Sequence, residues 1–204
     1  MKHFGLVVIG AHFGVWLENE INNYKNQNIL LVEPVPYNFK ILEKKFSEFK
    51  NIYIWKNAIF SEKKIKSFYY VDEKSIPKLG KHWASGIGSF DRNHILNHKS
   101  KRFKIEDADI VEMKIDFITF KQLIETFSIQ SIDKLQIDVE GAEYEILKSI
   151  DLQNVEINSI LFESKHFDGT FKEGSKLLEI KDKLSNAGYD LSQIDEENIL
   201  AEKN

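Results

Sequence analysis

The sequence predicts an α/β fold in which a doubly wound, mostly parallel sheet carries helices on both faces. Short apolar stretches typical of strands alternate with segments whose apolar residues recur at helical spacing. Glycine, proline or an acidic residue follows most of the apolar stretches. Because parallel strands joined by right-handed crossovers end at one edge of the sheet, we expect a ligand site at that edge.

Composition narrows the class of protein. We expect one domain over residues 1–204, and 42% hydrophobic residues indicate a folded globule. A net charge of −4 gives no basic surface, so no nucleic-acid partner is expected, and a chain without cysteine has neither disulfides nor cysteine-ligated metals. The early apolar run is too short to span a bilayer and no signal-peptide pattern precedes it, which predicts a cytoplasmic protein without membrane insertion. The sequence also allows a homo-oligomer.

The first part of the chain predicts three strands and two helices. The strands are Phe4–Ile9, Ile29–Val32, which ends at Glu33, and Ile52–Trp55. Proline at two positions after Glu33 prevents that strand from continuing. Apolar residues at helical spacing mark the helices, namely Leu17, Ile21 and Tyr24, then Phe39, Leu42, Phe46 and Phe49.

The middle of the chain breaks this alternation. Ile65–Val71 and Ile110–Phe117 are expected to be extended. Between them, residues 77–104 are rich in Gly, Ser, His and Lys, which predicts a long loop, insertion or lid.

The last part of the chain returns to strand and helix. A strand ends at Asp138, and Ser159–Phe162 is followed by Glu163. Tyr189–Ile194 and Asn198–Ala201 predict a terminal antiparallel hairpin. The helices between these strands are marked by Phe120, Leu123, Ile124 and Phe127, by Ile146, Leu147 and Ile150, and by Leu177, Ile180, Leu184 and Ala187 before Gly188.

A glycine loop, Gly10-x-x-x-Gly14, follows the first strand and is expected to open a helix. Glycine lets the backbone approach a ligand, and helix N–H groups suit the carboxylate and ribose of a nucleoside cofactor. A tight structural turn explains the loop equally well. The spacing lacks the third glycine of the dinucleotide fingerprint and no Gly-Lys-Ser/Thr follows, which disfavours NAD and a phosphate-binding loop.

Two further strand ends add candidate cofactor contacts. A carboxylate at Glu33 can accept the hydroxyls of a ribose; a solvated charge before proline is the alternative, and the glycine loop upstream favours the ribose. Asn57-Ala58-Ile59, after the third strand, would lie at the adenine edge of the same site.

Acidic residues crowd the end of the fourth strand of the parallel series. Asp138 and Glu140 precede a helix, and like charges held close raise a pKa, which favours a general base, a sulfonium cation or a divalent metal. Glu143 and Glu145 are expected to interact mainly with the helix dipole. His166 is a candidate base or a surface histidine, whereas His94 and His98 have the i,i+4 spacing of a helical metal pair. 

From Phe4 to about Ala201 the chain resembles the FkbM family of S-adenosylmethionine-dependent methyltransferases. The resemblance implies a Rossmann-like, seven-stranded class I methyltransferase fold. It rests on Gly10-Ala11-His12-Phe13-Gly14, Val32-Glu33-Pro34-Val35-Pro36, Asn57-Ala58-Ile59 and Ile137-Asp138-Val139-Glu140-Gly141-Ala142-Glu143. It implies cofactor contacts from Gly10, Ala11, His12, Gly14, Glu33, Pro34, Asn57, Ala58 and Asp138. This sequence departs from the family at Val8, where an acid is usual, at His12, where Asn is usual, and at Gln136, where Lys is frequent.

The leading hypothesis is methyl transfer from S-adenosylmethionine to a hydroxyl of a sugar, glycoconjugate or related small molecule. Asp138, Glu140 or His166 would accept the hydroxyl proton, and residues 77–104 would close over the site. A Mg²⁺ ion held by Asp138, Glu140 and Glu163 could instead lower the hydroxyl pKa. The remaining alternatives are an NAD-dependent oxidoreductase and a non-catalytic nucleoside-binding module.

Overall fold

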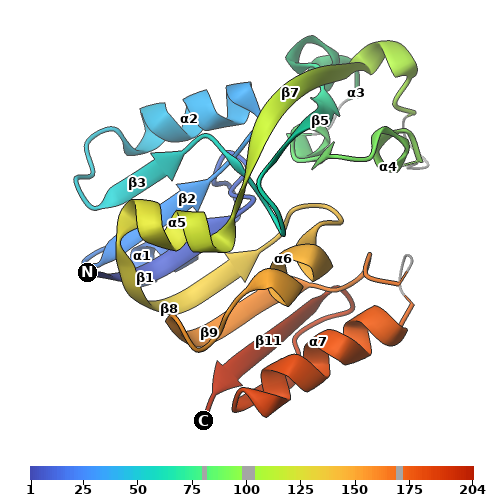
Figure 1. Cartoon of the computed structure of the whole chain (residues 1–204). Helices are drawn as coiled ribbons and strands as arrows, with labels where there is room; N and C mark the ends of the chain where they lie inside the picture. The colour runs from blue at the N-terminus through green and yellow to red at the C-terminus, as the bar shows by residue number, and fades with distance from the viewer. Residues whose placement is uncertain (80–81, 98–103, 169–171) are drawn as a thin grey trace.

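A computed structural model of the chain describes residues 1–79, 82–97, 104–168 and 172–204. Its central sheet has seven strands in the order β10-β11-β9-β8-β1-β2-β3 (Figure 1). Within this sheet, β11 is antiparallel to β9 and β10, and the other pairs are parallel. The predicted mostly parallel sheet with a C-terminal antiparallel hairpin is confirmed. The strands are β1 (Lys2–Ile9), β2 (Asn28–Val32), β3 (Ile52–Trp55), β8 (Ile129–Ile137), β9 (Glu156–Glu163), β10 (Tyr189–Gln193) and β11 (Asn198–Lys203).

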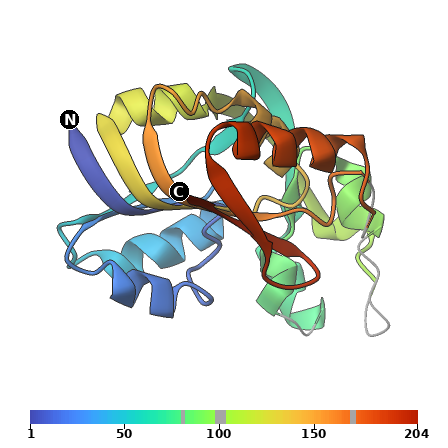
Figure 2. The same ribbon diagram turned by 90° about the horizontal axis from the view of Figure 1, so that it is seen from below.

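Helices cover both faces of this sheet, as Figure 2 shows from below. On one face lie α1 (Glu18–Asn23) and α2 (Pro36–Phe46); on the other lie α5 (Phe120–Phe127), α6 (Glu143–Ser149) and α7 (Ser175–Asn186). The two faces differ because strand side chains alternate. In β1, Leu6 and Val8 pack in the cluster with α1 and α2, whereas Val7 and Ile9 pack in the larger cluster with α5, α6 and α7.

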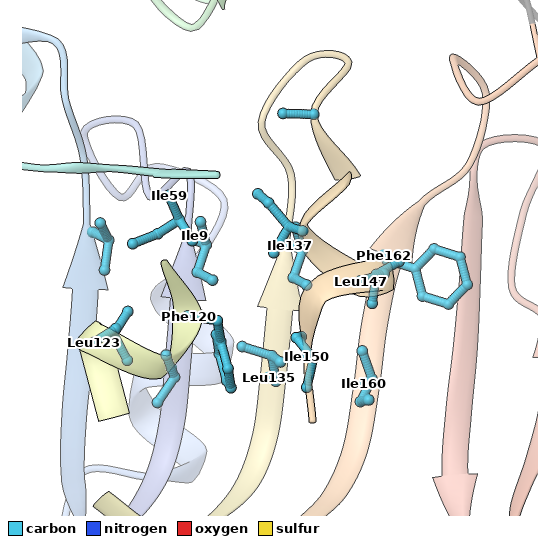
Figure 3. Packing of buried hydrophobic residues seen from close by; sticks show 14 of the residues in the cluster. Ile9, Ile59, Phe120, Leu123, Leu135, Ile137, Leu147, Ile150, Ile160 and Phe162 are labelled. Carbon is cyan, nitrogen blue, oxygen red and sulfur yellow. The ribbon is translucent and has the colours of Figure 1, made fainter. Parts of the chain in front are cut away.

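The larger cluster forms the main core. In Figure 3, Phe120 and Leu123 of α5 lie over the strands, and Leu147 and Ile150 lie beside Leu135 and Ile160. Phe120 is 3% exposed and Leu123 is fully buried. Burial of a side chain of this size contributes roughly 1.5–3 kcal/mol. The packing of α5 and α6 on the strands therefore stabilises the sheet whose strand ends form the site.

A second sheet lies at the edge where the central strands end (Figure 1). It contains β4 (Ala58–Phe60), β5 (Lys64–Val71), β6 (Gly88–Ser89) and β7 (Ile110–Thr119) in the order β4-β7-β5-β6. The two predicted extended segments are thus partners, paired antiparallel from Lys64 with Phe117 to Val71 with Ile110. The sequence predicted the strands but not the sheet, because the partners are far apart along the chain.

The segment between β5 and β7, for which the sequence predicted a long loop, insertion or lid at 77–104, contains short regular elements. Its described residues include α3 (Ile76–Leu79), β6 and α4 (Arg92–Asn97), with 3-10 turns at Glu73–Ser75, His82–Ser85 and, just before β7, Asp107–Asp109. The sequence did not predict these helices, because helices of four to six residues are too short to show an apolar period. The segment also has its own buried cluster. The cluster contains Val71, Leu79, Ala84, Ile87, Ile95 and Ile105.

One boundary differs from the sequence prediction. Helix α1 begins at Glu18, four residues after Gly14. The glycine loop therefore does not open directly into a helix. No helix among the described residues combines the length and apolarity needed to cross a membrane.

Candidate functional site

A pocket opens at the carboxyl ends of β1, β2, β3 and β8, under the second sheet. It holds about 1050 Å³ of empty space, including the part open to solvent. Three residues that are distant in the sequence, Gly10, Glu33 and Asp138, line it together. Parallel strands ending at one edge account for this convergence. The other sequence-predicted residues along the pocket wall are Ala11, His12, Pro34, Asn57, Ala58 and Glu140.

The backbone at position 10, in the pocket wall, has a conformation and a close neighbour that only glycine accommodates. Its φ angle is +89°, and a Cβ built there would lie 1.7 Å from the carbonyl oxygen of Asp138. The same two strand ends are joined by the Asp138 N–H, which donates to the Ile9 carbonyl at 3.0 Å. The tight turn alone therefore accounts for a glycine at this position. The missing side chain also leaves bare backbone facing the pocket.

The second loop glycine has a different environment. Gly14 has a φ angle of +74° and packs against Leu42 and Phe46 of α2. It does not line the pocket described above. Its assignment as a cofactor contact thus has no support from the pocket geometry. Ala11, in contrast, lies in the pocket wall and its N–H donates to the Val32 carbonyl at 3.0 Å.

Glu33 is a buried carboxylate at the end of β2, only 4% exposed. Its Oε2 accepts a hydrogen bond from the His12 N–H and its Oε1 accepts one from the Val35 N–H, both at 2.9 Å. Burial outweighs these hydrogen bonds and raises the pKa of Glu33 to about 8. The Asn38 side chain also donates to this group, and the ionised carboxylate, with about four acceptor positions, can still accept from a ligand in the pocket.

The inserted segment forms one wall of the pocket. Gly86, Gly88, Ser89 and Phe90 all line it. Ser85 joins this wall to the core: its hydroxyl contacts the His12 ring, and its carbonyl accepts from Asn38 Nδ2 at 2.7 Å. The role of this segment as a lid over the site stays a prediction.

Several pocket residues were not predicted from the sequence. Trp16 lines the pocket although it is 72% exposed. Aromatic side chains of the second sheet, Phe68 and Phe117, also line it. A tryptophan two residues after the glycine loop was the signal available for Trp16. Phe68 and Phe117 gave no local signal, because their position depends on the pairing of β5 with β7.

The acidic turn after β8 has an unusual backbone. Glu140 has a φ angle of +56° and Gly141 one of +108°. Glu143 holds this turn: its Oε1 accepts from the Val139 N–H at 2.8 Å and its Oε2 from the Gly141 N–H at 2.9 Å. Glu143 is 1% exposed, and burial raises its pKa to about 7. Its main role is to clamp the turn, beyond the helix-dipole interaction predicted from the sequence.

Asp138 and Glu140 present carboxylates to the pocket from this turn. Burial by surrounding atoms, together with the charge of Glu140, raises the pKa of Asp138 to about 6, although its side chain remains accessible from the pocket. Glu163 lies close to Asp138 and contacts Lys165. Burial and the charges of Glu140 and Asp138 raise the pKa of Glu163 despite that lysine.

The predicted magnesium ligands divide between two clusters. Glu140 groups with His94 and His166, whereas Asp138 and Glu163 group with Glu143. A single ion held by Asp138, Glu140 and Glu163 does not match this arrangement. His94 was predicted to pair with His98, which lies outside the described residues.

His166 lies behind Glu140 and not in the pocket wall. Its Nε2 is 3.7 Å from Glu140 Oε2, and it lines a smaller neighbouring hollow with Phe60, Phe90 and Phe167. His166 can therefore act on Glu140 more directly than on a molecule in the main pocket.

Comparison with known families agrees with this geometry. A model of the methyltransferase FkbM domain matches residues 9–191. The chain belongs to the FkbM methyltransferase family. A search of curated protein sequences finds no match to this FkbM chain.

Solved structures share the fold at low sequence identity. Methyltransferase FkbM from Methylobacillus flagellatus KT matches with a TM-score of 0.55 and 12% identity, over 98% of this chain and 43% of that one. This FkbM chain thus spans less than half the length of that protein. Weaker similarity, below a TM-score of 0.5, is found to precorrin-6y C5,15-methyltransferase from Geobacter metallireducens GS-15 (TM-score 0.48, 11% identity, 100% of this chain and 82% of that one) and to Aeropyrum pernix fibrillarin with natively bound S-adenosyl-L-methionine (0.45, 10%, 98% and 66%).

Two departures from the FkbM pattern occupy partner positions. Val8 of β1 is paired with Gln136 of β8 in the sheet register. Val8 is fully buried, and Gln136 lines the pocket. In the family pattern, the acid usual at position 8 and the lysine frequent at position 136 would be neighbours. An acid at position 8 without that lysine would be a buried, unpaired charge, which is costly. Replacement of both leaves the pair neutral.

Proposed function

We propose that this protein is an S-adenosylmethionine-dependent methyltransferase that methylates a hydroxyl of a sugar, a glycoconjugate or a related small molecule. The observation that carries the proposal is the convergence of Gly10, Glu33 and Asp138 in one pocket at the sheet edge, in a chain of the FkbM family. Membership of that family favours methyl transfer over NAD chemistry, and so does the absence of the third glycine.

The pocket residues fit an adenosyl cofactor by their chemistry. The Glu33 carboxylate would accept the two ribose hydroxyls, and Asn57 and Ala58 would lie along the adenine. The backbone of Gly10 to His12 would face the methionyl end. Carboxylates at Asp138 and Glu140 would provide a negative field for the sulfonium. When bound, S-adenosylmethionine supplies a methyl group that is already activated.

The remaining task of the protein is to orient the acceptor and remove its proton. Asp138 is the best placed base, because it lines the pocket at the end of β8. The Asp138 carboxylate would take the proton of the acceptor hydroxyl; the methyl group would come from the cofactor, which would leave as S-adenosylhomocysteine once its carbon–sulfur bond has broken. Glu140 is the second candidate, and His166 would act through Glu140.

Calorimetric titration with S-adenosylhomocysteine tests the cofactor assignment. We expect binding at micromolar concentration and none for NAD. Absence of binding at millimolar S-adenosylhomocysteine would defeat the proposal. Binding without methyl transfer to any member of a panel of sugars and glycoconjugates would favour the non-catalytic module instead. Transfer to amines in preference to hydroxyls would overturn the acceptor class alone.

A further inference from the structure

We infer that His94, Glu140 and His166 form a binding site for a divalent transition metal ion of the zinc class, beside the pocket. One ligand atom from each of these residues lies within 4.8 Å of the other two. Two imidazoles and one carboxylate are a common ligand set for such ions, and they leave a coordination position open. 

The distances are close to those of a metal centre. Glu140 Oε2 lies 3.5 Å from His94 Nε2 and 3.7 Å from His166 Nε2. Around a tetrahedral ion with bonds of about 2.1 Å, ligand atoms stand roughly 3.4 Å apart. The two carboxylate–imidazole distances therefore match this spacing within a few tenths of an ångström, and the two imidazole ligand atoms lie within 4.8 Å of each other.

Three separate segments bring the ligand atoms together. His94 comes from α4 in the inserted segment, Glu140 from the turn after β8, and His166 from the loop after β9. Each of the three ligand atoms is buried from solvent. The two imidazole rings meet edge to face, with centroids 4.9 Å apart.

The position of Glu140 is imposed by its backbone. A φ angle of +56° is uncommon for a glutamate, and the clamp that Glu143 forms on Val139 and Gly141 maintains it. The strained turn directs the carboxylate toward both histidines.

The ligand chemistry distinguishes this ion from the magnesium predicted from the sequence. Mg²⁺ is bound mainly by oxygen and keeps several waters, whereas neutral imidazole nitrogen suits zinc, iron, cobalt or nickel. Two histidines in the cluster therefore favour the second class. The alternative is an ion pair between Glu140 and protonated histidines, which the experiment below separates from a metal site.

The consequence for the reaction rests on the proposed function. Glu140 lines the main pocket as well as the cluster, so an ion held there would lie beside the acceptor. Coordination of the acceptor oxygen would lower the pKa of its hydroxyl, whose proton would pass to Asp138. Metal binding itself does not depend on that reaction.

The test is titration of Zn²⁺ into the full chain, prepared without a histidine tag and freed of metal by chelation. We expect one equivalent to bind to the wild type. His94→Gln and His166→Gln should each weaken binding by roughly tenfold or more, because each removes one of three ligands. The matched control is His3→Gln, since His3 also contacts a carboxylate, Asp133, but on another part of the sheet. The control should bind Zn²⁺ as the wild type does.

Undiminished binding in both cluster variants, or an equal loss in the control, would overturn the site. X-ray absorption of the Zn²⁺-loaded wild type keeps the test decisive if a variant fails to fold: two imidazole ligands are expected, and none would contradict the inference. Titration with S-adenosylhomocysteine in the presence of chelator isolates the proposed function. Cofactor binding without any zinc binding would reject the metal site alone, and the reverse result would reject the cofactor assignment alone.

Discussion

Gly10 shows how a single missing side chain shapes this molecule. The carbonyl of Asp138 occupies the space where a Cβ would lie, so the ends of β1 and β8 can meet directly beneath the pocket. The same close contact between β1 and β8 leaves no side chain at position 10 to fill the pocket. A substitution here should therefore affect folding and binding together.

We predict that Gly10→Ala lowers the free energy of unfolding by roughly 3 kcal/mol or more, because a clash adds to the cost of positive φ. Gly188→Ala is the matched control. Gly188 has a similar φ of +86°, but nothing lies within 4 Å of the added Cβ, so only roughly 1 kcal/mol should be lost. Urea unfolding measures both. Equal losses would mean that the approach of β8 to Gly10 imposes no constraint.

Glu33 is expected to make stability depend on pH in the ligand-free protein. Its pKa is raised from 4.5 to about 8 in the folded state, so the folded chain holds this proton more tightly than the unfolded chain. Its contribution is fully present below pH 4.5 and is lost as the pH rises through about 8. The stability difference between wild type and Glu33→Gln should shift against the wild type over this range.

Denaturant unfolding of both proteins at several pH values measures that difference. Subtracting the stability of Glu33→Gln from that of the wild type cancels the contributions of other buried carboxylates with raised pKa values, such as Glu143. A difference that stays constant with pH would show that Glu33 remains ionised throughout.

We also predict that Glu33→Ala weakens S-adenosylhomocysteine binding by about 1–3 kcal/mol, the range for a lost charge-assisted hydrogen bond. Glu125→Ala, at an exposed position on α5, should leave the affinity unchanged. Calorimetry gives both constants. If the two variants bind equally well, the ribose does not lie at the end of β2.

At the scale of elements, helix α2 holds both the inserted segment and β5 through side-chain hydrogen bonds. The Asn38 side chain of α2 donates to the Ser85 carbonyl, and Tyr37 donates to the Val71 carbonyl at 2.9 Å. Because Ser85 precedes the pocket-lining residues of this segment, the Asn38 bond helps to set the position of one pocket wall.

We therefore predict that Asn38→Ala increases hydrogen exchange in residues 82–97 while leaving β1 protected. The loss of a buried hydrogen bond should cost about 1–3 kcal/mol. Asn51→Ala is the control, since Asn51 likewise donates to backbone carbonyls, those of Lys25 and Gln27, away from the insertion. Exchange in residues 82–97 that rises equally in both variants would contradict this role.

At the scale of the whole molecule, the sequence was most informative where the signal was local. Strands that end at Gly10, Glu33 and Asp138 could be read from neighbouring residues, and the rule for parallel sheets then placed all three at one edge. The pairing of β5 with β7 was not predictable, because nothing near Ile65 identifies a partner some fifty residues later.

The histidines show the same limit at the site. His94 suggested a partner four positions away, His98, which lies outside the described residues, whereas nothing local to His94 indicated the His166 and Glu140 that the structure places against it. Glu143 likewise suggested a helix-dipole interaction, and its clamp on the preceding turn depends on burial that the sequence does not reveal. Tertiary folding decided both contacts.

The clamp has a consequence for selectivity. Because Glu143 fixes the peptide groups of Val139 and Gly141 from within the same chain, the turn that carries Asp138 and Glu140 is organised before anything arrives. Binding of a ligand would then cost little free energy for ordering this part of the site. Selectivity among ligands would depend on how well their shape fits a rigid turn, because the turn would not rearrange to accommodate a poor fit.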